Sequence, residues 1–126
     1  MMKVPRNETK VMKVMIVDDH PQVRRMIRSF IADVVDEFVE CADGSEALGS
    51  YSQHQPDIVL MDINMNTMDG ITATKSIKAA FPNAFVVILS QSDSPELRAA
   101  AASAGVKGYF NKTDLVPLRD MLIAEL

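Results

Sequence analysis

The sequence predicts an α/β protein with a doubly wound (βα)5 fold, in which helices cover both faces of a five-stranded parallel sheet. Short apolar runs alternate with segments of helical period, and this alternation is typical of βα units. Three runs, at 14–17, 58–61 and 85–89, are continuously apolar, as expected for strands buried on both faces. Polar residues follow these runs, and sheets of this kind bind ligands at the carboxyl ends of their strands.

Two weaker runs complete the expected sheet. The segments 37–42 and 106–110 carry charged residues or glycine among their apolar residues. One side of each segment therefore has to meet solvent, and we expect both strands at the edges of the sheet. The connections between strands are expected to be right-handed crossovers.

The first helix is expected at about 21–32, with Pro21 in its first turn. Its apolar residues recur at helical spacing. They are Val23, Met26, Ile27 and Phe30. The remaining positions hold three arginines, which could dock an acidic partner or serve only solubility on a solvent face. They are Arg24, Arg25 and Arg28.

Three further helices are expected at about 45–53, 71–80 and 94–105. Ser94 is a suitable N-cap for the last of these, and Gly105 a suitable end. The fifth helix has two candidate starts. Thr113 could cap it. Alternatively, the helix could begin near Val116, because Val116 precedes Pro117 and a residue before proline is disfavoured inside a helix. In the second case we expect a short helix that packs little surface.

The size and composition suit a single globular domain. The chain has 126 residues, of which 48% are apolar and 24% charged, and this balance is not that of a disordered chain. The net charge is −4 and no basic block is present, so we expect no direct nucleic-acid binding by this chain. We expect residues 1–12 to be an N-terminal extension and residues 13–126 to form the domain.

The cysteine count and the apolar runs indicate the compartment. Cys41 is the only cysteine, which excludes an intrachain disulfide and fits a reducing environment. The N-terminus lacks the apolar core of a signal peptide, and no apolar run approaches the length that spans a membrane. We therefore expect a cytoplasmic protein.

Side chains suited to a metal and a phosphoryl group follow four of the expected strands. Asp18 and Asp19 follow the first, Asp62 the third, Ser90 the fourth and Lys112 the fifth. Adjacent acids repel each other unless a cation joins them, and a small set of oxygen ligands suits Mg²⁺, or Mn²⁺ in its place. We expect all five side chains to converge on one edge of the sheet.

Each of these residues also has an ordinary structural interpretation. Acids before a helix are favoured by the helix dipole, and serines after strands are common in turns. A carboxylate such as Asp62 can be the nucleophile of phosphoryl transfer, and Lys112 can reach a phosphate, yet most lysines are simply solvated. The joint placement after strands one, three, four and five favours the chemical interpretation.

Five motifs in order resemble the receiver domain of bacterial response regulators, from about Lys13 to the end of the chain. They are Val-Asp-Asp-His-Pro at 17–21, Leu-Met-Asp-Ile-Asn-Met at 60–65, Met-Asp-Gly at 68–70, Leu-Ser at 89–90 and Gly-Tyr-Phe-Asn-Lys at 108–112. The residues of these motifs are most similar to those of receivers that control helix-turn-helix transcription factors. The resemblance implies the flavodoxin-like fold with strand order 2-1-3-4-5, as in the chemotaxis receiver.

The resemblance also implies a role for each matching residue. Asp62 matches the phosphoacceptor, Asp19 the direct Mg²⁺ ligand and Asp18 its neighbour, which acts through water. Asn64 matches the position whose backbone carbonyl ligates the metal, and Lys112 the lysine that pairs with the phosphoryl group.

Two further positions match the switch of the family. Ser90 matches the switch hydroxyl, and Tyr109 matches the switch aromatic, whose ring turns inward when that hydroxyl moves toward the phosphate. Taken alone, Tyr109 is equally compatible with a half-buried ring on an edge strand.

The sequence departs from the family pattern at three positions. Asn66 stands where proline is common, and Gln91 follows Ser90 where a small residue is common. Both bear on the lifetime of a phosphorylated state, and Gln91 could crowd or shield the phosphoryl site. Thr113 follows Lys112, and the displaced last helix bears on the signalling surface.

The resemblance implies a signalling module that catalyses only its own phosphorylation and dephosphorylation. Its donor would be a histidine kinase or a histidine phosphotransfer protein. Its output would pass to a downstream protein or an attached output domain, and a phosphorylation-dependent homodimer is compatible with it.

Three rival functions are considered. An aspartate-dependent phosphatase needs a second acid at the position of Asn64. A flavin carrier needs a hydroxyl-rich loop after the first strand, where this chain has Asp18 and Asp19. A degenerate receiver would signal without phosphate, yet every chemical position is filled.

Overall fold

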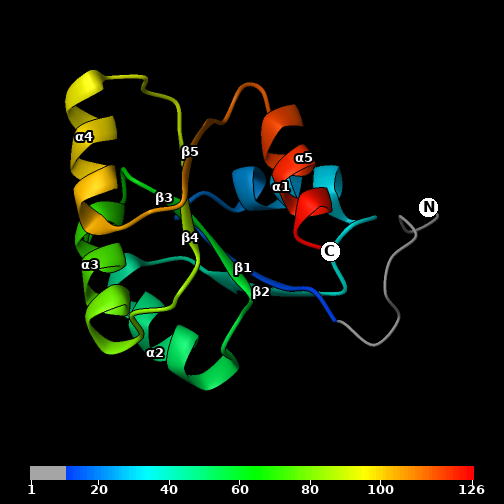
Figure 1. Cartoon of the computed structure of the whole chain (residues 1–126), viewed down its shortest axis with the longest axis horizontal. Coiled ribbons are helices and arrows are strands. Elements are labelled where there is room, and N and C mark those ends of the chain that lie inside the picture. Colours follow the sequence, from blue (N-terminus) through cyan, green and yellow to red (C-terminus); the bar gives the residue numbers. More distant parts are fainter. Residues whose placement is uncertain (1–10) are drawn as a thin grey trace.

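Strands and helices alternate along residues 11–126, the part of the chain that the computed structural model describes (Figure 1). The strands are β1 (Lys13–Val17), β2 (Glu37–Cys41), β3 (Ile58–Asp62), β4 (Val86–Ser90) and β5 (Gly108–Asn111). The helices are α1 (Pro21–Ile31), α2 (Gly44–His54), α3 (Gly70–Ala80), α4 (Pro95–Ala104) and α5 (Val116–Ala124). Residues 1–10 of the expected N-terminal extension, 1–12, lie outside the described residues, and Met12 is buried. The domain boundary stays a prediction.

The five strands form one parallel sheet in the order β2-β1-β3-β4-β5, which confirms the predicted fold. Every residue of β3 and β4 is buried, whereas β2 and β5 are partly exposed at the edges. The central runs are continuously apolar because both faces of these strands are covered. The expectation of edge strands near 37–42 and 106–110 is also confirmed.

Two hydrophobic cores lie on opposite faces of the sheet. Helices α1 and α5 cover one face, and α2, α3 and α4 cover the other (Figure 1). Successive strand residues alternate between the cores, since Ile16 and Leu60 face the first and Val17 and Met61 face the second. Because β1, β3 and β4 run parallel, their carboxyl ends are aligned at one edge of the sheet.

The buried stripe of α1 differs in part from the predicted one. Ile27 and Ile31 are buried and Val23 is half-buried, but Met26 and Phe30 are 45% and 41% exposed. Residues spaced by four lie along one side of a helix, so the row through 23, 27 and 31 faces the sheet. Helical spacing alone did not distinguish this row from the neighbouring one.

The caps of the other helices follow local hydrogen-bonding rules. Asp43 accepts a hydrogen bond from the backbone amide of Ser45, so α2 begins one residue earlier than predicted. Ser94 caps α4 by accepting from Leu97, as predicted. Gly105 ends α4 in the left-handed region, at φ 94°, which glycine adopts without steric cost.

Helix α5 takes the later of the two predicted starts. It begins at Val116 with proline in its first turn, which matches the restriction that Pro117 places on its neighbour. The expectation that so short a helix packs little surface is wrong, because Leu118 and Leu122 are fully buried in the first core. Arg119 adds two hydrogen bonds to the Asp33 carboxylate, at 2.5 and 2.7 Å.

None of the helices within residues 11–126 combines the length and the apolar character needed to cross a membrane.

We predict that Leu118→Ala lowers the free energy of unfolding by about 2–5 kcal/mol, because it leaves a cavity under α5. Ile123→Ala on the exposed side of the same helix is the matched control and should cost about 0.5 kcal/mol or less. Urea denaturation followed by circular dichroism measures both. Equal effects of the two substitutions would contradict the packing of α5.

Candidate functional site

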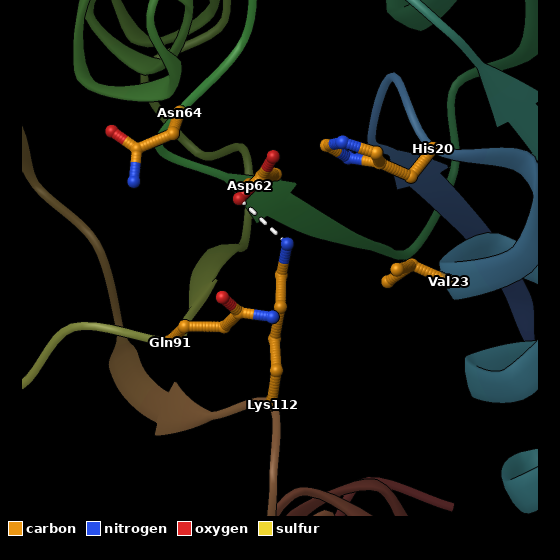
Figure 2. Close-up of a pocket in the computed structure, with 6 residues that line it drawn as sticks. All are labelled: His20, Val23, Asp62, Asn64, Gln91 and Lys112. Atoms are coloured by element: carbon orange, nitrogen blue, oxygen red, sulfur yellow. Dashed lines mark hydrogen bonds and ion pairs between the residues drawn. The ribbon is translucent and has the colours of Figure 1, made fainter.

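The Lys112 ammonium joins two buried carboxylates at the edge of the sheet. Its Nζ donates hydrogen bonds of 2.7 Å to Asp18 Oδ2 and 2.7 Å to Asp62 Oδ1. All three residues are buried, Asp18 at 1% and Asp62 at 4% exposure. Figure 2 shows the lysine reaching from the end of β5 to Asp62 at the end of β3. The predicted convergence of distant residues is therefore present.

Backbone contacts hold the two acids in place. The Asp18 amide donates to the carbonyl of Cys41 at 3.0 Å, and Arg24 Nη1 donates to the Asp18 carbonyl at 2.5 Å. On the other side, α3 starts directly against β3. A Cβ at Gly70 would overlap the backbone carbonyl of Asp62, so only glycine lets the helix approach this closely.

Burial and ion pairing act in opposite directions on these groups. Burial raises the pKa of Asp62 above its ordinary value of 3.8, and the charge of Asp18 adds to this, while Lys112 opposes both. For Lys112, burial alone would lower the pKa. Its hydrogen bonds to Asp18 and Asp62 outweigh that cost and raise the pKa above 10.5. The lysine is therefore charged, and the Asp62 carboxylate is a desolvated, comparatively basic group.

The second acid of the pair, Asp19, has an unsatisfied oxygen. Its Oδ1 is buried and accepts no hydrogen bond from the described residues. Asp18, Asp19, His20 and Asp62 each offer a ligand atom, and these four atoms lie within 4.8 Å of one another. A buried anionic oxygen without a donor is costly, and a divalent cation would satisfy it. The donor set fits Mg²⁺ or a similar ion.

A pocket of about 170 Å³ opens over this cluster. Its lining consists of His20, Val23, Asp62, Asn64, Gln91 and Lys112 (Figure 2). His20, Asn64 and Gln91 are exposed and form its polar rim, whereas Asp62 and Lys112 lie buried below. The pocket has room for several water molecules or a phosphoryl group beside Asp62, since a water occupies about 30 Å³ in the liquid.

Ser90 and Tyr109 meet beside the pocket rather than in it. The Ser90 hydroxyl is buried and accepts a hydrogen bond of 3.0 Å from the Ser92 amide. The Tyr109 hydroxyl donates to the carbonyl of the same Ser92 at 2.8 Å, and Arg98 stacks 4.6 Å from the Tyr109 ring centroid. The two residues are thus connected through one residue, Ser92, of the loop between β4 and α4. Neither lines the pocket.

Two residues that line the pocket were not assigned a role from the sequence. His20 and Val23 line the pocket, and the position of His20 directly after the two acids was the available signal. Two of the arginines considered for docking are engaged within the chain. Arg24 and Arg28 both pair with Glu40, at 3.0 Å each. No local pattern indicated that pairing, because Glu40 lies on another element.

Comparison with known proteins agrees with this geometry. The family model described as the response regulator receiver domain matches residues 14–122. The chain belongs to this family. Receiver domains are the signalling modules of two-component systems.

Individual relatives include regulators of transcription and of chemotaxis. This receiver is 40% identical over 100 residues to the uncharacterized transcriptional regulatory protein YhcZ of Bacillus subtilis, covering 78% of the chain and 47% of YhcZ. It spans about half the length of several curated relatives that it matches.

Solved structures share the fold. A LuxR-family two-component response regulator from Aurantimonas sp. SI85-9A1 has a TM-score of 0.80 at 31% identity, with 91% of this chain and 87% of that chain covered. The CheX–CheY–BeF3–Mg²⁺ complex from Borrelia burgdorferi has a TM-score of 0.79 at 30% identity, with coverage of 93% and 92%.

We predict that Lys112→Met destabilises the metal-free receiver by about 3 kcal/mol or more, because the buried carboxylates of Asp18 and Asp62 lose their cation. Mg²⁺ should restore part of the loss, since a divalent ion neutralises the same acids. Lys75→Met, at an exposed lysine, is the matched control. Thermal unfolding with and without Mg²⁺ measures the effect, and an equal response of both variants would contradict it.

A second prediction concerns Asp62 and pH. An acid whose pKa is higher in the folded state contributes stability below its ordinary pKa, and this contribution is lost as pH rises through the folded-state pKa. In metal-free protein at pH 7, Asp62→Asn should therefore be more stable than the wild type. The difference should shrink as pH falls and Asp62 takes up its proton, because burial raises the pKa of Asp62. Urea midpoints at pH 7 and below test it, and a difference that grows on acidification would contradict it.

Proposed function

We propose that this receiver accepts a phosphoryl group on Asp62 from a phosphohistidine of a sensor histidine kinase or a histidine phosphotransfer protein. The observation that carries the proposal is the buried Lys112, which joins Asp62 to Asp18 below an open pocket. A desolvated carboxylate beside a fixed ammonium suits phosphoryl transfer, whose transition state needs positioning and neutralisation of charge.

The transfer step uses the carboxylate of Asp62 as nucleophile. One of its oxygens attacks phosphorus, the phosphorus–nitrogen bond to the donor histidine breaks, and the electron pair leaves with the imidazole nitrogen, which is protonated from solvent. Lys112 already lies 2.7 Å from Asp62 and would follow the charge onto the phosphoryl oxygens. Asp62 ends the step as an acyl phosphate.

A divalent cation, Mg²⁺ or Mn²⁺, would neutralise the phosphoryl oxygens during this step. Asp19, Asp62 and the backbone carbonyl of Asn64 would hold it, with Asp18 assisting through water. The support from this chain is the buried Asp19 Oδ1 that accepts no hydrogen bond among the described residues. Further support is that the Borrelia burgdorferi CheY complex contains BeF3 and Mg²⁺.

The loop between β4 and α4 would transmit the change. Ser90 would turn its hydroxyl toward the phosphoryl group and weaken its hydrogen bond from the Ser92 amide. Tyr109 donates to the carbonyl of the same residue, so a shift of Ser92 would alter the ring and the surface formed by α4, β5 and α5. That surface would contact a downstream protein, an attached output domain or a second phosphorylated copy, in the cytoplasm.

The polar rim favours a receiver over an enzyme that turns over a substrate. Asn64 lines the pocket two residues after Asp62, where an aspartate-dependent phosphatase needs a general acid. An amide cannot donate a proton in that way. Gln91 also lines the pocket, so the expected crowding of the phosphoryl site has a physical basis. The chain would therefore catalyse only the gain and loss of its own phosphoryl group.

We predict that acetyl phosphate with Mg²⁺ adds one phosphoryl group to the wild type and none to Asp62→Asn, as measured by intact-protein mass spectrometry. Asp19→Asn should need about tenfold or more Mg²⁺ for half-maximal labelling, because it removes a metal ligand. Asp120→Asn, at an exposed acid on α5, is the matched control and should label like the wild type. Labelling of Asp62→Asn would refute the assignment of the phosphoacceptor.

A further inference from the structure

The imidazole of His20 lies beside the acidic cluster, and the start of α1 does not depend on it. His20 is the N-cap residue of α1, but its side chain makes no capping hydrogen bond. Its backbone amide donates to Asp18 Oδ1 at 2.9 Å, whereas the ring lies farther from the same oxygen, at 3.3 Å. The backbone amide therefore orients the Asp18 carboxylate, and the ring adds a longer contact with the same oxygen.

The distances around the ring match the spacing of ligands on one cation. His20 Nδ1 lies 2.9 Å from Asp19 Oδ1 and 3.3 Å from Asp18 Oδ1. Donor atoms bound to one ion at about 2.1 Å are separated by about 3.0 Å at right angles and by about 3.4 Å at tetrahedral angles. The contact with Asp19 is not a hydrogen bond, since that buried oxygen has no hydrogen-bond partner among the described residues. A shared cation accounts for both the close approach and the unsatisfied oxygen.

The ring also faces the acid on the opposite side of the pocket. Figure 2 shows the His20 side chain pointing across the pocket toward Asp62. The pocket lining includes both residues, and the ligand atoms of His20, Asp18, Asp19 and Asp62 lie within 4.8 Å of one another. The imidazole is 63% exposed, so it can adjust its rotamer to meet an ion without rearranging the core.

A nitrogen donor changes which cation the site prefers. Carboxylates and carbonyls suit Mg²⁺ and Mn²⁺, whereas imidazole suits Zn²⁺, Ni²⁺ and Cu²⁺. Three carboxylates alone would make a hard oxygen site. Adding His20 makes a mixed nitrogen and oxygen site, and such a ligand strengthens the binding of Zn²⁺ far more than that of Mg²⁺.

We propose that His20 is a metal ligand and that the acidic pocket also takes a borderline divalent cation such as Zn²⁺, in competition with Mg²⁺. The inference rests on the proposed function in one respect, since it adds a ligand to the cation site used for phosphorylation. Zn²⁺ held by His20, Asp18 and Asp19 occupies the same acids that Mg²⁺ needs. The share of the protein ready for phosphoryl transfer then depends on both cations.

Calorimetric titrations of the full chain with Zn²⁺ and with Mg²⁺ test the proposal. The wild type should bind Zn²⁺ more tightly than Mg²⁺, and His20→Leu should reduce the ratio of Zn²⁺ to Mg²⁺ affinity by about tenfold or more. His54 is the only other histidine of the chain, so His54→Leu is the matched control and should retain the ratio. An unchanged ratio in His20→Leu would overturn the proposal.

Ring-nitrogen NMR of the unsubstituted protein provides a test that needs no variant. Zn²⁺ should shift the ¹⁵N resonance of His20 Nδ1 and leave that of His54 in place, whereas Mg²⁺ should shift neither strongly. A His20 resonance that does not respond to bound Zn²⁺, or the absence of Zn²⁺ binding, would overturn the proposal. In either case, Mg²⁺-dependent labelling of Asp62 would still support the proposed function, whereas loss of Mg²⁺ binding by the wild type would overturn both.

Discussion

The two ion pairs of Lys112 are the interaction on which the rest of the site depends. A lysine this deeply buried needs acids to keep its charge, and the buried carboxylates of Asp18 and Asp62 are stabilised by the cation between them. The lysine follows β5, the acids follow or end β1 and β3, and 94 positions separate Lys112 from Asp18. The parallel sheet, in the strand order 2-1-3-4-5, brings these ends to one edge.

The same cluster is an electrostatic cost to the fold. Burial raises the pKa of Asp62, and Asp19 has a buried oxygen without a donor among the described residues. One ammonium cannot neutralise three acids, so the metal-free site retains excess negative charge in a poorly hydrated place. A divalent cation relieves this charge, and the pocket leaves room for a phosphoryl group at the same position. The feature that weakens the fold is therefore the one that would favour binding of a cation.

Much of the fold and of the site could be predicted from local rules. Strands buried on both faces carry continuous apolar runs, and polar residues at their ends mark the functional edge. The predictions failed where the sequence alone does not show which side of a helix packs against the sheet. The buried row of α1 includes the predicted Ile27 and continues to Ile31, whereas the predicted Met26 and Phe30 are exposed. The short α5 is anchored by Leu118 and Leu122. Which of two adjacent helical rows faces the sheet depends on how the helix docks.

The sequence by itself determined the kinds of group present and their positions at the ends of strands, because hydrophobic period, proline and cap residues act over a few neighbours. Tertiary structure alone decided the pairings of Lys112 with Asp18 and Asp62, and of Tyr109 with Ser92, the residue that also contacts Ser90. It also placed the His20 ring among the acids. The contacts of Lys112 and Tyr109 join residues far apart in the chain, and their distances depend on the packing of whole strands and helices, which no local pattern records.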